Sequence, residues 1–350
     1  MKNAIQMTCL AVIVAGLGSY AAAASLETVP VGNTGNTADT RYYASGYGAV
    51  DYKYSMGKYE VTSGQYRDFL NAVDPTGVNA DGLYKTDMDN QSYGCQITWN
   101  SGSSTYDFSG APSGAAADWQ DRPVNFITWY DAAMYTNWAT SGNIHQGAYE
   151  TTVASNWGSS TASDYTGITA HDSPAMDALV STYGTVYVIP TENEWYKAAF
   201  YSSSGDIYYD YPTGSNDLPG RDMTEATNPG NNANSYGTPF LLDSPYYATV
   251  GGEFELSGSP YGTFDQCGNV WEWNELLYDS APSSYRGRRG GSLFDFSSGT
   301  GILHASSGSS GDPTMESVIN GFRVAAIPEP TTVTLLALGG LAILRKRRKK

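Results

Sequence analysis

Basic residues are scarce in this chain. It has 19 Lys and Arg residues against 35 Asp and Glu residues, which gives a formal net charge of −16 in 350 residues. An acidic surface repels nucleic acid and anionic lipid, so nucleic acid is not an expected partner. The same charge suits divalent cations or simply keeps the protein soluble.

Cysteine is also scarce, with three residues in the whole chain. Cys9 lies in the apolar N-terminal run, which leaves Cys95 and Cys267 in the body of the chain. One disulfide between these two is possible in an oxidising compartment, and two separate thiols are equally consistent with the sequence.

Long apolar runs are confined to the two ends. Residues 1–24 carry a lysine at position 2, an apolar run from Cys9 to Leu17, and the small residues Ala22 to Ala24 before Ser25. This is the layout of a secretory signal peptide. An uncleaved membrane anchor is the competing interpretation, although the run is shorter than the roughly 20 residues that a span needs.

The C-terminal residues 327–350 form a three-part signal. Pro328-Glu329-Pro330 precedes an apolar run, Thr331 to Leu344, and then six consecutive basic residues. As a helix the run would be about 21 Å long, which is short for a hydrocarbon core of roughly 30 Å, and the basic cluster would hold the C-terminus in the cytoplasm. An ordinary C-terminal anchor would differ only in keeping its tail.

The order of these three parts resembles the bacterial PEP-CTERM sorting signal. The resemblance implies a short transmembrane helix that inserts transiently and is removed by an exosortase-type processing enzyme. It also implies export through the inner membrane of a Gram-negative-type bacterium. The mature protein would then lie at the cell surface or in the extracellular matrix.

Three helices are predicted by capping residues that precede apolar residues at helical spacing. The capping pairs are Thr62 with Gln65, Thr128 with Asp131, and Thr191 with Glu194. We assign these side chains a structural role. Two polar segments, about residues 75–120 and 141–184, are interpreted as long surface insertions, and the alternating residues 184–190 predict a strand.

The stretch DQCGNVWEWNEL, from Asp265 to Leu276, places a carboxylate in an apolar strand. Alternation puts Trp271 and Trp273 on one face and Glu272 on the other. Glu272 is therefore either a surface carboxylate on a half-buried strand or a metal-binding or catalytic group, since a charge so close to a core needs a partner.

Six motifs in order resemble the formylglycine-generating enzyme, or sulfatase-modifying factor, family. They are GKYEVTSGQYRDFL, RPVNFITWYDAAMYTNWA, IPTENEWYKAAF, YGTFDQCGNVWEW, RRGGSL and GFRVAA. The resemblance implies an α+β fold, a variant of the C-type lectin fold, as one irregular and loop-rich domain over residues 25–326. We expect the GKYEVT and GFRVAA segments to lie side by side, because the ends of a domain often meet.

The same resemblance implies two calcium sites. One would use the side chains of Asp265 and Glu272 with the carbonyls of Gly268 and Val270. The other would use Asn234, Asp243 and the carbonyls of Ser235 and Pro245. Calcium accepts six to eight carboxylate and carbonyl oxygens, so both sets are chemically reasonable.

The catalytic cysteine pair of the family is missing. Family enzymes bind copper through two cysteines after GGS, whereas this chain has LFDFSSGTGILHASSG there, with Asp295 and Thr300 near the expected positions. Copper(I) selects soft sulfur ligands, so no copper is expected. A rearranged active site would draw on Asp295, Arg289 and His304.

A second branch of the family binds non-haem iron through H-x3-H-x-E spacing. The histidines of this chain are His145, His171 and His304, and none has that spacing. A site made from all three would need residues of the insertions to converge on the pocket. Solvent-exposed histidines are the simpler interpretation.

Two functions follow as hypotheses. The first is a non-catalytic exported module that binds extracellular polysaccharide, peptide or matrix, with exposed aromatic rings available for stacking on sugars. The second is an oxidoreductase of the same family with a rearranged active site.

Overall fold

The computed structural model describes residues 26–112, 116–151, 170–224, 230–237, 239–240, 242–243, 246–277, 285–295 and 301–328. The predicted signal peptide and residues 329–350 of the C-terminal signal lie outside this part of the chain, as do Pro245 and Thr300.

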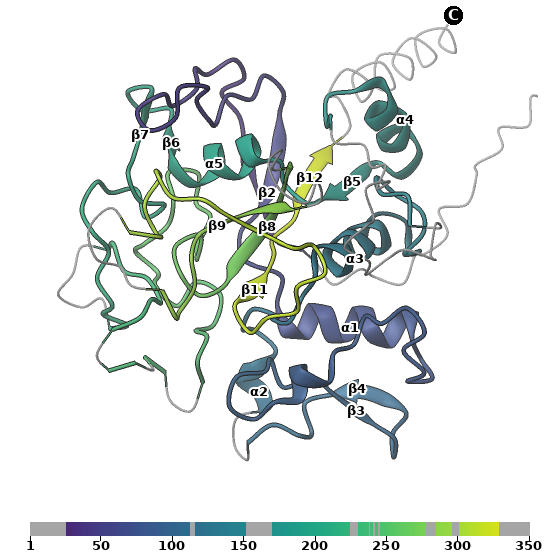
Figure 1. The fold of residues 1–350 in the computed structure, drawn as a ribbon. Coiled ribbons are helices and arrows are strands. Elements are labelled where there is room, and N and C mark those ends of the chain that lie inside the picture. Colours follow the sequence, from purple (N-terminus) through teal and green to yellow (C-terminus); the bar gives the residue numbers. More distant parts are fainter. Residues whose placement is uncertain are drawn as a thin grey trace, which may run out of the picture.

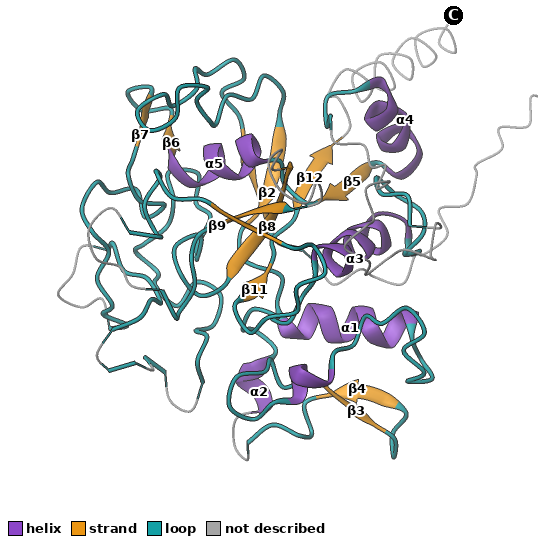
Figure 2. Ribbon diagram, viewed as in Figure 1, coloured by secondary structure: helices purple, strands orange, loops and turns teal. Residues whose placement is uncertain are grey.

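Most strands belong to two four-stranded sheets near the middle of the molecule (Figures 1 and 2). The first sheet has the order β1 (Thr28–Val31), β2 (Tyr54–Gly57), β12 (Ala325–Pro328) and β5 (Thr185–Val188). The second has the order β10 (Ser309–Gly311), β9 (Arg286–Arg289), β8 (Trp271–Leu277) and β11 (Asn320–Gly321). Two hairpins pair β3 (Thr98–Asn100) with β4 (Thr105–Asp107), and β6 (Tyr201–Ser202) with β7 (Ile207–Tyr208).

The two ends of the described chain meet in the first sheet. Strand β12 pairs antiparallel with β2, with Ala325 opposite Met56. The amide of Gly57 donates to the carbonyl of Val324 at 2.7 Å. The predicted contact between the GKYEVT and GFRVAA segments is thus confirmed, and so are the strands predicted at residues 184–190 and in WEW.

The three helices predicted from their caps are confirmed. They are α1 (Ser63–Val73), α3 (Trp129–Ser141) and α5 (Glu192–Phe200), and each begins with a complete capping box. The remaining helical elements are the 3-10 turn η1 (Thr86–Asp89), α2 (Ala116–Trp119) and α4 (Pro174–Tyr183). Helix α4 begins at the cap Ser173, a signal that the sequence analysis did not use.

Both predicted insertions contribute to the main hydrophobic core. Met88, Ile97 and Tyr106 come from the first, and Met176 and Val180 from the second. Each is 0–1% exposed. The polar composition predicted that the insertions lie on the surface, but these parts of them are buried. Scattered apolar side chains are enough to join them to the core.

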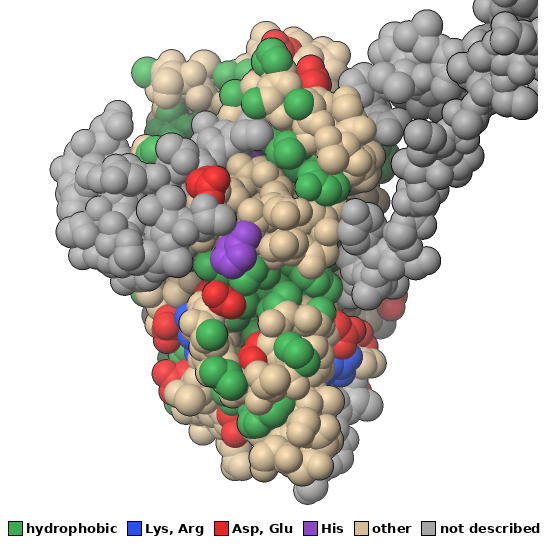
Figure 3. Space-filling view, turned by 90° about the vertical axis from the view of Figure 1, so that its right-hand side faces the viewer, with side chains coloured by type: hydrophobic (Ala, Val, Ile, Leu, Met, Phe, Trp, Pro, Cys, Tyr) green, Lys and Arg blue, Asp and Glu red, His purple; other side chains and the backbone are tan. Residues whose placement is uncertain are grey.

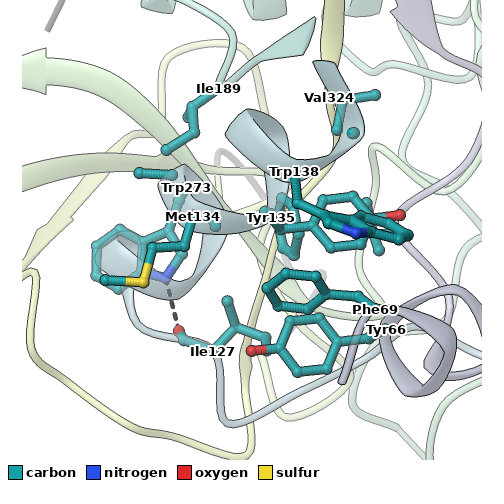
Figure 4. Packing of buried hydrophobic residues seen from close by; sticks show 14 of the residues in the cluster. Tyr66, Phe69, Ile127, Met134, Tyr135, Trp138, Ile189, Trp273 and Val324 are labelled. Carbon is teal, nitrogen blue, oxygen red and sulfur yellow. Dashed lines mark hydrogen bonds between the residues drawn. The ribbon is translucent and has the colours of Figure 1, made fainter. Parts of the chain in front are cut away.

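Aromatic side chains from α1 and α3 fill the centre of this core (Figure 4). Tyr66 and Phe69 pack against Tyr135, with ring centroids 6.1 and 5.3 Å apart. Trp273 of β8 is fully buried beside them, and its indole N–H donates to the carbonyl of Ile127 at 2.8 Å. One ring thereby links the second sheet to the start of α3.

The side of the molecule that carries α3 and α4 shows Asp and Glu side chains with few Lys and Arg side chains among them (Figure 3). This agrees with the acidic composition. Among the described residues, no helix is both long and apolar enough to cross a membrane.

We expect truncation of Trp273 to Ala to destabilise the protein by about 3–5 kcal/mol, because it removes a fully buried ring and leaves a cavity. Chemical denaturation monitored by circular dichroism measures the change. Val78→Ala, at a side chain that is 73% exposed, is the control and should change the free energy of unfolding by less than about 0.5 kcal/mol. An equal loss in both variants would contradict the packing described here.

Candidate functional site

Glu272 is fully buried in β8 and paired with an arginine. The Nε of Arg323 lies 2.5 Å from one oxygen of Glu272, and a second guanidinium nitrogen lies 2.6 Å from the other. The indole N–H of Trp195 donates to the same carboxylate at 2.6 Å. The partner that the sequence required is therefore Arg323, and Glu272 is not a surface carboxylate.

Arg323 holds several segments together through its other hydrogen bonds. It donates to the carbonyl of Gly57 at the end of β2 and to the carbonyl of Phe264, each at 2.9 Å. Burial alone would lower the pKa of Arg323, but the adjacent charge of Glu272 raises it. The guanidinium thus remains charged inside the protein.

Two further carboxyl groups lie near this ion pair. Glu60 is 3% exposed and accepts a hydrogen bond from the Asn269 side chain at 2.8 Å. Burial, followed by the charges of Asp265 and Glu272, raises the pKa of Glu60 well above its usual value. Burial also raises the pKa of Asp265 to about 6. One arginine therefore faces three carboxyl groups. Glu60 was not predicted as part of this site, although it lies within the GKYEVT motif.

The first predicted calcium set fits this arrangement poorly at Glu272. Both of its oxygens are bonded to Arg323, and a guanidinium beside them repels a second cation. Asp265 keeps one oxygen bonded to the amide of Gly252 at 2.6 Å. Among the described residues, no group of three or more His, Cys, Asp or Glu side chains is arranged to hold a metal ion.

The second predicted set is partly described. Asn234 forms a β-bridge with Gly268, so the two sets adjoin each other. The Asn234 amide donates to the Tyr247 carbonyl at 3.0 Å, and Asp243 pairs with Arg122 at 2.6 Å. Ser235 is fully buried. Calcium binding at either set stays a prediction.

The segment that carries chemistry in the resembling enzymes begins with a glycine pair. Gly290 and Gly291 have φ of 96° and 74°, and a Cβ on Gly291 would lie 2.7 Å from Leu303. The next residue, Ser292, donates to the Asp295 side chain through its hydroxyl at 2.7 Å. Asp295 therefore closes a local turn rather than facing a pocket with Arg289 and His304.

Arg289 and His304, the other two pocket candidates, also have structural contacts. Arg289 pairs with Glu192 at 2.5 Å and donates to the carbonyl of Ala305 at 3.1 Å. His304 is 6% exposed, and its Nδ1 lies 2.8 Å from the hydroxyl of Ser306. Arg289 thus lies close to the segment that carries His304, whereas Asp295 is bonded to Ser292.

Cys95 and Cys267 are both buried and unbonded to each other, so the disulfide is excluded. Burial raises the pKa of the Cys95 thiol to about 11 and that of Cys267 further still. Neither thiol is ionised near pH 7, which makes both poor nucleophiles.

His171 was expected to be exposed but is 2% exposed. Its Nδ1 lies 2.9 Å from both oxygens of Glu194, the residue that also caps α5. Its Nε2 lies 4.0 Å from Glu275, which in turn accepts a hydrogen bond from Tyr149. His145, by contrast, is exposed, as the simpler interpretation predicted. No sequence spacing could have shown the His171 contacts, because its partners are distant in the chain.

A group of aromatic rings, here called the aromatic patch, lies over the segment that follows the glycine pair. It consists of Tyr93, Tyr236, Phe240, Tyr247 and Phe294, with neighbouring ring centroids 4.8–6.2 Å apart. Tyr93 is 43% exposed and Tyr236 is 36% exposed. Clustered rings at the surface are uncommon, since large aromatic side chains are usually covered, and they often mark binding sites.

A small recess lies under the aromatic patch. Its volume is about 10 Å³, and its walls include Tyr93, Cys95, Trp119, Tyr247 and Leu293. Leu293 directly follows the GGS motif, so one wall of the recess comes from the start of the segment in which the family resemblance places the cysteine pair.

Comparison with known protein families decides the assignment. A model of the sulfatase-modifying factor enzyme 1-like domain matches residues 22–327. The chain belongs to this family. A PEP-CTERM protein-sorting motif matches residues 326–349 of the same chain. That motif indicates export, processing by an exosortase-type enzyme, and an envelope or surface location in a Gram-negative-type bacterium.

No curated protein matches this member of the family. Among solved structures, CarF is 16% identical, with a TM-score of 0.43, over 87% of this chain and 98% of its own. PvdO from Pseudomonas aeruginosa is 15% identical, with a TM-score of 0.43, over 86% and 92%. Treponema denticola variable protein 1 is 16% identical, with a TM-score of 0.41, over 86% and 95%. These distant likenesses carry no information on activity.

We expect Glu272→Gln to destabilise the protein by about 3–5 kcal/mol, because it leaves the buried Arg323 without a counter-charge. The double variant Glu272→Gln with Arg323→Met should recover part of this loss. Denaturant unfolding measures each variant. Glu27→Gln, in the exposed pair with Lys58, is the control and should change stability by no more than about 1 kcal/mol. A loss at Glu272 no larger than this would contradict the role of the ion pair.

The His171 contacts predict a pH dependence of stability. Burial alone would lower the pKa of His171, but Glu194 and then Glu275 raise it above its usual value. The resulting stabilisation is fully present below about pH 6.5 and is lost as pH rises through the raised pKa. The excess melting temperature of the wild type over His171→Gln should therefore shrink between pH 6 and pH 9.

Thermal melts at several pH values measure this difference, and His145→Gln is the matched control at an exposed histidine. A constant difference between the wild type and His171→Gln across the range would show that the charge on His171 does not contribute.

Proposed function

We propose that this exported domain is a non-catalytic binding module of the cell envelope or its exopolysaccharide matrix, and that it binds through the aromatic patch. One irregular, loop-rich domain related to the C-type lectin fold is part of this proposal. The observation that carries it is the aromatic patch, in which Tyr93 and Tyr236 are exposed and Phe294 lies next to Asp295, one of the two positions where the family resemblance places a cysteine. Uncharged rings offer stacking area and no group that activates oxygen.

An oxidoreductase with a rearranged active site is less well supported. Arg289 is held by Glu192, and Asp295 is held by Ser292. His304, the third residue proposed for that chemistry, contacts Ser306, so all three are engaged in structural contacts. Burial also raises the pKa values of the two described thiols. The exposed rings of Tyr93 and Tyr236, by contrast, are not accounted for by packing in the core.

Cosedimentation of the full chain with exopolysaccharide isolated from the producing bacterium tests the proposal. We expect the wild type to bind and Tyr93→Ser with Phe294→Ser to lose at least tenfold in affinity, because stacking area is removed. Ile207→Ser is the control, since Ile207 has the same 43% exposure as Tyr93 but lies outside the patch. Equal binding by both variants would contradict a role for the patch.

The same preparation should not convert a peptide with the cysteine-containing sulfatase motif to the formylglycine product, with or without copper, because the cysteine pair is missing. Mass spectrometry of the peptide measures the product. Turnover above a control without protein would overturn the non-catalytic assignment.

From the family resemblance we also propose that calcium binds the native domain. Calcium should then raise the melting temperature relative to chelator, since a ligand a hundredfold above its Kd stabilises by about 2.7 kcal/mol. Asp265→Asn should reduce that rise, and Asp81→Asn, at an exposed carboxylate, should not. Identical melting of the wild type in calcium and in chelator would contradict the proposal.

A further inference from the structure

Two residues in the walls of the recess under the aromatic patch each have a buried polar side-chain atom without a hydrogen-bond partner. These atoms are the indole N–H of Trp119 and the side-chain oxygen of Asn125, whose residues are 5% and 8% exposed. Buried polar groups are nearly always bonded, so a donor and an acceptor left open on residues of one recess point to a missing polar group.

The orientation of Asn125 is fixed by its own amide nitrogen. That nitrogen donates to the carbonyl of Tyr93 at 2.7 Å and to the carbonyl of Val318 at 3.1 Å. The side-chain oxygen is therefore the free acceptor. The hydrogen bond from Asn125 to the Tyr93 carbonyl also fixes the backbone of Tyr93. One contact therefore positions a residue of the recess and a residue of the aromatic patch.

The size of the recess limits what can enter. A volume of about 10 Å³ accommodates roughly one water-sized group. A hydroxyl is such a group, and it can accept from the Trp119 N–H while donating to the Asn125 oxygen. A backbone carbonyl or amide can satisfy only one of the two atoms.

None of the described residues that line the recess has a charged side chain. Arg122, whose guanidinium lies 5.9 Å from the Trp119 ring, is already paired with Asp243 at 2.6 Å, so it offers an anionic ligand little free counter-charge. Such a ligand would also meet a chain with a net charge of −16. The rings of Tyr93 and Tyr247, whose centroids are 4.8 Å apart, lie at the same recess and offer faces for an apolar ring surface. The site thus suits a ring that is apolar on one face and bears neutral hydroxyl groups.

We propose that the aromatic patch binds an uncharged saccharide and that one of its hydroxyl groups enters the recess between Trp119 and Asn125. This inference rests on the binding function proposed above and specifies the chemical class of its ligand. The sugar ring stacks on Tyr93 and Tyr247, and the hydroxyl fills the recess.

Isothermal titration of the full chain with neutral hexasaccharides of glucose, galactose, mannose and N-acetylglucosamine tests the inference, with a uronic acid hexasaccharide for comparison. We expect at least one neutral hexasaccharide to bind and the uronic acid one to bind more weakly. Trp119→Phe should weaken the binding about tenfold or more, because it removes the donor and keeps an aromatic ring. The matched control Trp99→Phe changes a half-buried tryptophan of β3 outside the recess and should bind like the wild type.

A series of monodeoxy analogues identifies the hydroxyl. One analogue should bind the wild type about tenfold more weakly, and Trp119→Phe should not discriminate against it, since the contact is already lost. If Trp119→Phe does not fold, the same series measured on the wild type alone shows whether one sugar hydroxyl contributes to binding.

The outcomes separate the two proposals. If exopolysaccharide binds through the patch but no neutral saccharide or deoxy analogue is distinguished, the binding function stands and this inference is wrong. If a saccharide binds and Trp119→Phe loses no more than Trp99→Phe, the recess holds water only and the inference is again wrong. If neither exopolysaccharide nor any hexasaccharide binds, both proposals are wrong.

Discussion

The buried ion pair between Glu272 and Arg323 is the interaction on which the rest of the structure depends. It joins β8 to the segment before β12, and its further hydrogen bonds reach Trp195 of α5 and the end of β2. Charges in a low-dielectric interior interact strongly and are costly to separate, so these segments are fixed relative to one another. The raised pKa values of Glu60 and Asp265 follow from the same centre, because burial opposes their charged forms and Arg323 is already paired.

This frame explains how the region after the glycine pair could change without loss of the fold. Gly290 and Gly291 supply the positive φ values, and the turn between Ser292 and Asp295 closes locally. The side chains of Leu293 and Phe294 are then free to form a recess and an aromatic surface. In this chain the described part of that segment contributes Leu293 to the recess and Phe294 to the aromatic patch, and it contains no cysteine.

The parts of the fold that were predictable are those set by short-range rules. Capping boxes at Thr62, Thr128 and Thr191 act over three residues, and the helices begin where the sequence placed them. The family motifs added the contact between the two ends of the domain. Polar composition hid the buried parts of the insertions. Met88 lies in a short 3-10 turn without a periodic pattern, whereas Met176 and Val180 have helical spacing after the cap Ser173, and that local signal was outweighed by the polar residues around it.

The sequence by itself determined the acidic surface, the sorting signal, the helix starts and the absence of the cysteine pair, since each depends on residue type or on neighbours a few positions apart. Only the tertiary structure decided that Glu272 pairs with Arg323, that His171 is buried against Glu194, and that Trp119 and Asn125 line one recess. The two ion pairs join residues far apart in the chain, and the recess is completed by the distant Tyr247 and Leu293. Their geometry depends on how the sheets and helices pack, which local patterns do not encode.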